Sequence, residues 1–302
     1  MEVKYWLTLV QVPESDQLIE IARFAEEVGF HGISVADHLV MPTQIASRYP
    51  YTEDGEIFWP LDAPWPDPWV TLGAMGAVTR TLRLATNIYL AGLRDPFTAA
   101  KAAATTAVLS DNRVVCGVAA GWIAEEYALA GIDFASRGRR LDEQLEVMRK
   151  LWTGREVEHH GEFFDIEHAL LCPAPTEEIP IYVGGASPPA LRRAARADGW
   201  FGVPMATEQM GPFLQTLRGE RESAGLPWEG YEVSISLAEP QTRENTTELE
   251  ALGVGSLCVI APWVPSPWGS TPWYDEAADP GALDAKRFAM ERFAEAVIHA
   301  FG

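Results

Sequence analysis

Short apolar runs alternate along the chain with segments whose apolar residues recur at helical spacing. The first run, residues 3–10, reads V-K-Y-W-L-T-L-V, and it is followed by Leu18, Ile21, Ala25 and Val28. A short apolar run predicts a buried strand, and recurrence every three or four residues predicts an amphipathic helix that packs against it. This alternation is typical of βα units built around a parallel sheet.

The pattern continues to the end of the sequence. Further strands are expected at 32–36, 82–90, 113–119, 179–185, 199–203, 231–237 and 256–261. Helices are expected near 68–79, at about 96–109 and at about 282–301. A further helix that ends at Gly154 is expected from the spacing of Leu141, Leu145, Met148 and Trp152. Eight strands, each followed by a helix, favour a closed (β/α)8 TIM-like barrel over an open sheet. The whole chain, 1–302, is therefore predicted to be a single α/β barrel domain.

Two segments interrupt the regular spacing. A long loop, 41–66, follows the second strand, and an insertion covers about 155–179 with E-V-E-H-H-G-E-F-F-D and a proline-rich exit. His159 and His160 lie in this insertion without further ligands at metal-binding spacing, so we expect both to be solvated and predict no metal site.

Charge and cysteine content narrow the possible partners. The 43 acidic and 23 basic side chains give a formal net charge of −20, which disfavours nucleic acid and anionic membranes as partners. A local basic pocket can still hold an anionic ligand within such a surface. Cys116, Cys172 and Cys258 form no C-x-x-C pair, so neither a disulfide framework nor a zinc site is expected. No apolar run has the length of a membrane span or the form of a signal peptide, and a cytoplasmic enzyme is expected.

Catalytic groups of (β/α)8 barrels lie at the carboxyl ends of the strands, and the second strand ends on Asp37 and His38. Histidine moves protons near neutral pH, and an adjacent acid can orient it. The same pair can equally be a solvated cap on a loop.

At the end of the third strand, T-N-I (86–88) places Asn87 in an apolar run, which indicates either an irregular backbone at a ligand site or a polar strand end.

The fourth strand ends on A-A-G-W, followed by two acids. Gly121 permits the close approach of a flat ligand, and Trp122 can form either a pocket wall or part of the core. Glu125 and Glu126 begin a short helix, where acidic side chains complement the helix dipole.

The clearest local signal follows the strand at 179–185. G-G-A-S (184–187) combines two glycines with a serine that caps the next helix, and such turns bind phosphate through backbone N–H groups. Gly-rich loops are also common without a ligand. G-x-S-x-G and the P-loop motif are absent from the sequence.

Tryptophan and proline are concentrated in the loop 41–66 and after the last strand. Aromatic walls suit a hydrophobic or planar organic substrate. Alternatively, these side chains cover the barrel mouth or a subunit interface. The tryptophans concerned are Trp59, Trp65, Trp263, Trp268 and Trp273, of which we select Trp59, Trp65 and Trp263 as candidate substrate contacts.

Taken together, these segments resemble the luciferase-like flavin-dependent monooxygenase superfamily up to about residue 203. The resemblance rests on residues 22–38, 67–86, 94–101, 109–127, 137–143, 179–187 and 197–200. D-H-L-V-M-P-T and G-W-I-A-E-E-Y together resemble most the branch that uses the deazaflavin coenzyme F420.

The resemblance implies a barrel that holds a flavin or deazaflavin at the strand ends. His38 matches the active-site histidine, and Asp37 would orient it or contact the cofactor. Thr86, Asn87 and Ile88 match a segment that often contains a non-prolyl cis peptide against the ring. Gly121 and Trp122 are also expected to contact the cofactor. The matched phosphate-binding residues are Gly184, Gly185, Ala186 and Ser187, with Gly202 and Val203 completing the site.

One position departs from the family pattern. The glucose-6-phosphate dehydrogenase members have a glutamate acid where this chain has Trp122, so that activity is not expected, and Glu125 is one candidate for the acid. The resemblance predicts an F420-dependent oxidoreductase acting on a small hydrophobic or planar substrate, and a homodimer. The alternatives are an FMN-dependent monooxygenase and a non-catalytic partner subunit.

Overall fold

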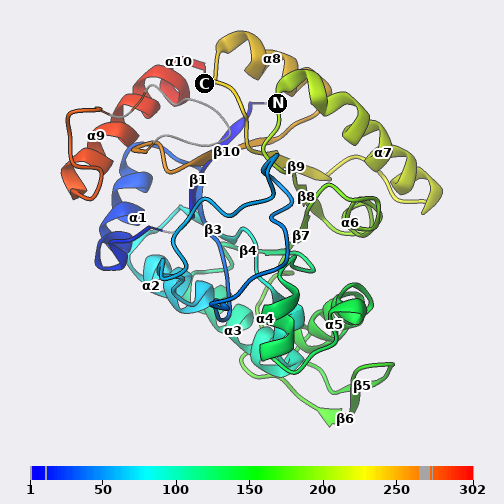
Figure 1. The fold of residues 1–302 in the computed structure, drawn as a ribbon. Helices are drawn as coiled ribbons and strands as arrows, with labels where there is room; N and C mark the ends of the chain where they lie inside the picture. Colours follow the sequence, from blue (N-terminus) through cyan, green and yellow to red (C-terminus); the bar gives the residue numbers. More distant parts are fainter. Residues whose placement is uncertain (1, 11, 265–272, 274, 302) are drawn as a thin grey trace.

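Eight parallel strands close into a barrel at the centre of the molecule (Figure 1). The computed structural model describes residues 2–10, 12–264, 273 and 275–301. The barrel strands are β1 (Lys4–Leu9), β2 (Gly32–Val35), β3 (Arg83–Thr86), β4 (Val114–Val118), β7 (Ile181–Gly184), β8 (Gly199–Phe201), β9 (Glu232–Ile235) and β10 (Ser256–Ile260). Their order around the barrel is β1-β10-β9-β8-β7-β4-β3-β2. The predicted (β/α)8 barrel is confirmed.

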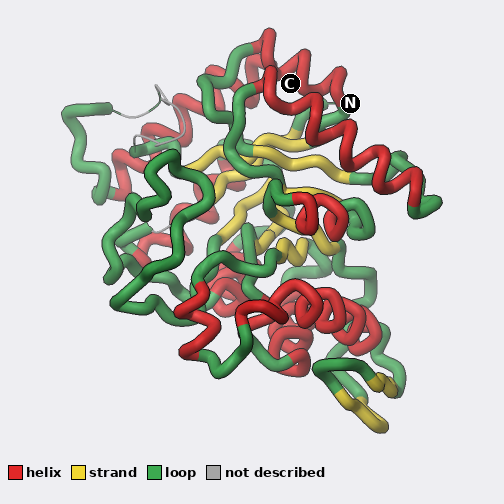
Figure 2. Tube along the Cα trace, turned by 45° about the vertical axis from the view of Figure 1, so that its right-hand side comes forward, coloured by secondary structure: helices red, strands yellow, loops and turns green. Residues whose placement is uncertain are grey.

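Helices form the outer layer of the barrel (Figure 2). They are α1 (Leu18–Glu27), α2 (Pro68–Val78), α3 (Pro96–Leu109), α4 (Ala124–Leu129), α5 (Arg137–Trp152), α6 (Pro188–Ala194), α7 (Met210–Ser223), α8 (Arg243–Leu252), α9 (Leu283–Phe293) and α10 (His299–Phe301). The expected last helix is interrupted by a π-helical turn at Ala294–Ile298. Two helices begin on Asp-Pro: the carboxylates of Asp67 and Asp95 accept hydrogen bonds from the first turns of α2 and α3. No helix in the described part of the chain has the length and apolarity to cross a membrane.

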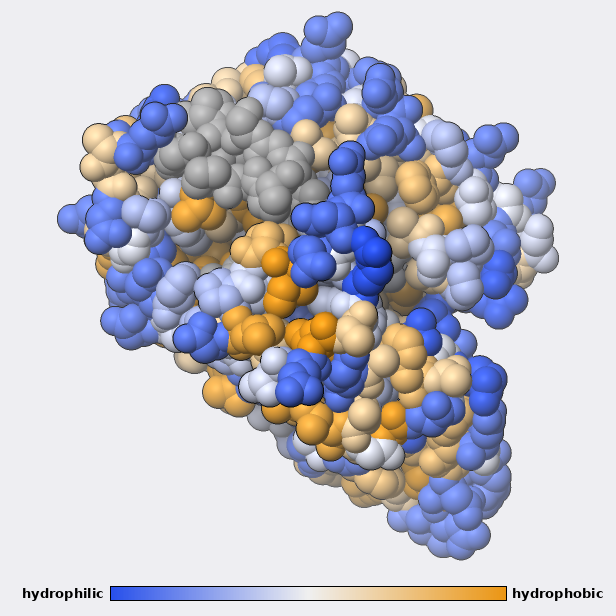
Figure 3. All heavy atoms as spheres, in the orientation of Figure 1, coloured by the Kyte–Doolittle hydropathy of each residue, from blue (hydrophilic) through white to orange (hydrophobic). Residues whose placement is uncertain are grey.

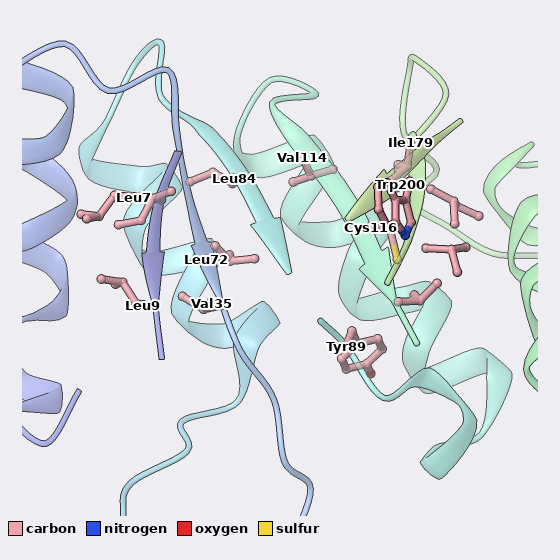
Figure 4. Close-up of a cluster of buried hydrophobic side chains, with 14 of the residues drawn as sticks. Leu7, Leu9, Val35, Leu72, Leu84, Tyr89, Val114, Cys116, Ile179 and Trp200 are labelled. Carbon is pink, nitrogen blue, oxygen red and sulfur yellow. The ribbon is translucent and has the colours of Figure 1, made fainter. Parts of the chain in front are cut away.

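The barrel strands are buried on both faces. Trp6, Tyr182 and Phe201 belong to a cluster within the barrel, whereas alternate residues such as Leu7 and Leu84 pack against the helices (Figure 4). Burial on both faces explains why the strands read as continuous apolar runs in the sequence.

The insertion at 155–179 forms an antiparallel hairpin of β5 (Val157–His160) and β6 (Asp165–Ala169). Its turn is held by Glu143 of α5, which accepts hydrogen bonds from backbone N–H groups at 162–164. The prediction that His159 is solvated is wrong: it is 7 % exposed, and its Nε2 lies 3.1 Å from Glu143 Oε1. Successive strand residues face opposite sides, so His160 is exposed as expected.

Candidate functional site

A cavity of about 1380 Å³ opens at the carboxyl ends of the barrel strands. It is larger than most small-molecule sites, which span roughly 300–1,000 Å³. The sequence-predicted residues that line it are Asp37, His38, Trp59, Trp65, Asn87, Ile88, Gly121, Trp122, Gly184, Gly185, Ala186, Ser187, Gly202 and Val203. Barrel closure therefore brings together strand ends that are far apart in the sequence.

His38 is held at one edge of the cavity by a buried carboxylate. Its Nδ1 lies 3.0 Å from Glu126 Oε2, and the Glu126 side chain is 1 % exposed. The other oxygen, Oε1, accepts hydrogen bonds from the N–H groups of Leu39 at 2.6 Å and Val40 at 3.3 Å. A carboxylate at Nδ1 favours the tautomer with a proton on that nitrogen. His38 Nε2, which has no partner among the described residues, is then left to act on a ligand.

Asp37 has a different role from the one expected. Its carboxylate forms a bidentate ion pair with Arg94, at 2.7 and 2.9 Å, and accepts a hydrogen bond from Leu90 N–H. Burial alone would lower the pKa of Arg94, but the hydrogen bond and charge of Asp37 raise it. The prediction that Asp37 orients His38 is therefore wrong. Adjacent residues leaving a strand point in different directions, and the orienting acid is Glu126.

An aromatic wall surrounds the His38 ring. The ring centroid of His38 lies 4.7 Å from that of Trp65, 6.3 Å from Trp59 and 6.5 Å from Trp122. Tyr49 packs edge-on against both Trp59 and Trp122, at 5.1 and 5.2 Å. The wall therefore joins the end of β4 to the loop 41–66, which crosses the barrel mouth in Figure 1.

Glu125 anchors this loop. Its carboxylate accepts hydrogen bonds from the N–H groups of Ala46 and Ser47 and from the Ser47 hydroxyl, at 2.7–3.2 Å. The Ser47 hydroxyl is the main cause that lowers the pKa of Glu125. A carboxylate stabilised in its ionised form is a poor proton donor, so Glu125 does not fit the acid role.

Another part of the cavity lining, at the ends of β3 and β7, is built from close backbone approaches. The peptide bond between Asn87 and Ile88 is cis, as the resemblance implies. Gly184 lies against Ile88: a Cβ on Gly184 would stand 2.6 Å from Ile88 Cδ1. Gly185 follows with a φ of 107°, a conformation that favours glycine. The turn then ends at Ser187, whose side chain accepts a hydrogen bond from Ala190 N–H and caps α6.

Three of the remaining predicted positions do not line this cavity. Thr86 is fully buried and donates its hydroxyl to Gly117 O at 2.7 Å. Trp263 is 4 % exposed and belongs to the main core, so its predicted substrate contact is wrong. Trp273 packs against Phe293 of α9. Trp268 lies outside the described residues.

Sequence reasoning missed Glu126, Tyr49 and a set of cavity arginines. The acidic pair Glu125–Glu126 is visible in the sequence, but helix-dipole complementarity explains it without a ligand. The arginines that line the cavity are Arg137, Arg139, Arg149, Arg192, Arg193 and Arg196. Only three acidic residues in the described part of the chain line it as well, namely Asp37, Asp142 and Glu146. A local cationic region thus exists on a chain of net charge −20.

Comparison with known proteins agrees with this architecture. An uncharacterised protein of Mycobacterium bovis is 36% identical over 280 residues, covering 93% of this chain and 94% of the relative. An F420-dependent glucose-6-phosphate dehydrogenase of Nakamurella multipartita is 33% identical over 219 residues, covering 69% of this chain and 59% of the relative.

Two solved structures share the fold. An F420-dependent secondary alcohol dehydrogenase in complex with an F420-acetone adduct has a TM-score of 0.76 at 18% identity, with full coverage of both chains. The oxygenating constituent of 3,6-diketocamphane monooxygenase from Pseudomonas putida, in complex with FMN, has a TM-score of 0.71 at 15% identity, with 98% of each chain covered.

The luciferase-like monooxygenase family model matches residues 2–275, from the first barrel strand to beyond the last. The chain belongs to the luciferase-like monooxygenase family.

Proposed function

We propose that this protein is an F420-dependent oxidoreductase that transfers a hydride between the deazaflavin and a small hydrophobic or planar organic substrate. The observation that carries the proposal is the His38–Glu126 pair, set between an aromatic wall and a cavity with a cationic outer part. Proteins named as F420-dependent occur both among the relatives and among the solved structures of the same fold.

The cavity fits a flat ring that carries an anionic tail. Ile88, Val183 and Phe201 give its inner part an apolar surface, and the glycine turn at 184–187 with neighbouring arginines offers donors to a phosphate. We assign the ring-facing role to Asn87 and Ile88, with Gly121 and Trp122 flanking it. Gly202 and Val203 would complete the phosphate site.

Bound deazaflavin would supply the hydride chemistry, and the protein would supply orientation and electrostatics. His38, kept in one tautomer by Glu126, can hold or move a proton at Nε2 as charge develops on the substrate. Trp59, Trp65 and Trp122 would exclude water and select an apolar or planar substrate. The indole of Trp122 cannot serve as an acid, which argues against glucose-6-phosphate as the substrate.

FMN-dependent monooxygenation is the second candidate function, because an FMN-bound monooxygenase shares the fold at a TM-score of 0.71. A titration of the purified protein with F420 and with FMN, followed by quenching of intrinsic tryptophan fluorescence, separates the two. We expect saturable quenching by F420 and none by FMN at the same concentration. Tight FMN binding without F420 binding would reverse the assignment, and binding of neither would favour a non-catalytic subunit. A homodimer and a cytoplasmic location stay predictions from the sequence.

A further inference from the structure

The cavity continues beyond the barrel mouth into a groove between α5 and α6. On α5 its lining includes Gly138, Asp142, Leu145 and Arg149, which are spaced at helical intervals and so share one face, and also Arg139 beside them. On α6 and the turn after it, the lining includes Pro189, Arg193 and Arg196. α5 packs on α3 and α6 on α7, and among the described residues no comparable packing joins α5 to α6. Figure 3 shows the surface indented between these two helices, on the right of the view.

The groove is rich in guanidinium groups. Three of its arginines have acidic partners: Arg193 pairs with Asp142, Arg149 with Asp198 and Arg139 with Glu162.

Arg192 and Arg196, four residues apart, are exposed, and neither has an acidic partner among the described residues. Two unneutralised cations on one side of a groove are unexpected on a protein with 43 acidic and 23 basic residues. Their chemistry suits carboxylates or phosphates, which guanidinium groups bind through paired N–H donors.

The groove begins where the glycine turn ends. Ser187 closes the turn and caps α6, and Pro189, Arg192 and Arg193 line the cavity within the next six residues. If the phosphate of a ligand lies at this turn, any anionic part of the ligand beyond the phosphate therefore extends along α6. FMN ends at its phosphate, whereas coenzyme F420 continues into a chain of γ-linked glutamates that carries several carboxylates.

We propose that the α5–α6 groove binds the oligoglutamyl tail of coenzyme F420, with Arg192 and Arg196 as its principal carboxylate contacts. This inference rests on the proposed function, because it assigns the outer part of the same cavity. It also gives the groove a part in selectivity, since only a cofactor with a polyanionic extension occupies it. Contacts between exposed charges are individually weak and are screened by salt, so the contribution of the groove is largest at low ionic strength.

The test compares coenzyme F420 with a long glutamyl tail and the same coenzyme trimmed to its phospholactyl group. Both are titrated into the full-length protein, into Arg192→Gln/Arg196→Gln and into Arg155→Gln. Arg155 is an exposed arginine in the insertion that does not line the cavity, and it serves as the matched control. The readout is the dissociation constant from fluorescence quenching, at low and at high salt.

We expect the double variant to bind the long-tailed coenzyme about tenfold more weakly at low salt, the scale of two exposed ion pairs. Binding of the trimmed form should change less than about twofold, the control should match the parent protein, and high salt should remove the difference. An equal loss for both forms, or no loss for either, overturns the groove assignment and leaves the proposed function standing. Failure of both forms to bind the parent protein overturns the two together.

Discussion

Glu126 determines how the histidine at the end of β2 presents its ring to the cavity. One carboxylate oxygen holds His38 Nδ1, and the other holds the two N–H groups that begin the long loop. The same buried side chain therefore fixes both the imidazole tautomer and the backbone beside it. We regard His38 as the candidate catalytic residue and Glu126 as its positioning residue.

On the proposed function, replacing either residue should lower the rate of F420 reduction or oxidation. His38→Ala should lower turnover by about 100-fold, the scale of lost acid–base catalysis, and change cofactor affinity by less than about tenfold. Glu126→Gln should lower turnover by about 10-fold or more, as loss of an orienting partner does. The amide no longer favours a proton on Nδ1 of His38, so kcat should fall while the KM for the cofactor changes by less than about twofold.

The matched control is Glu125→Gln, which changes the neighbouring carboxylate that anchors the loop at Ala46 and Ser47. Its kcat should stay within about twofold of that of the parent protein. An unchanged kcat in Glu126→Gln would reduce Glu126 to a second loop anchor, and unchanged turnover in His38→Ala would remove His38 from the mechanism.

At the level of elements, the Asp37–Arg94 pair joins the end of β2 to the 3-10 turn at Ala91–Leu93. Both side chains are nearly buried, at 1 % and 9 % exposure. Arg94 also lies over the Tyr89 ring, with its Cζ 4.4 Å from the centroid. The pair therefore fixes the backbone that follows the cis peptide and supports the cavity, which Asp37 also lines. A contact between Asp37 and the cofactor stays a prediction.

Asp37→Ala should lower the free energy of unfolding by about 3–5 kcal/mol, because it leaves the Arg94 guanidinium buried without a partner. Arg94→Met in the same chain should recover part of this loss, since both charges are then absent. Urea unfolding of the two single variants and the double variant measures the coupling between them. Strictly additive effects would show that the two side chains do not stabilise each other.

At the level of the whole molecule, the barrel has a titratable group at the end opposite the cavity. His31 precedes β2 at its amino end and contacts Trp6 edge-on at 5.5 Å. Burial is the main cause that lowers the pKa of His31 to about 4, and the charges of Lys4 and Arg83 add to it. The unfolded chain, with a histidine pKa of 6.5, therefore binds more protons than the folded protein between pH 6.5 and 4.

Stability should consequently fall as the pH decreases from about 6.5 to about 4. We expect His31 to account for about 1–2 kcal/mol of this loss, a value reduced for the partial solvent exposure of the ring. His31→Gln removes the titration, and its unfolding free energy should depend less steeply on pH over this window. Carboxylates contribute equally to both proteins, so identical slopes would exclude His31 as the cause.

Local features of the sequence determined much of the fold. Eight apolar runs mark the eight strands, because parallel strands are buried on both faces. The Asp-Pro pairs at 67–68 and 95–96 begin two helices, as expected from capping and the fixed φ of proline. The glycines at 184–185 mark the turn after β7, because Gly185 adopts a positive φ that favours glycine.

Only the tertiary structure decided which of the polar groups meet. His38 and Glu126 are 88 residues apart, and Asp37 and Arg94 are 57 apart. Such pairs depend on barrel closure, which places successive strand ends side by side, and no local period encodes them. Closure also placed Trp263 in the main core and Trp59 at the cavity wall, although both side chains are buried and lie in similar tryptophan- and proline-rich segments. The sequence by itself determined the elements and where chemistry could lie, and the packing of distant segments decided the partners.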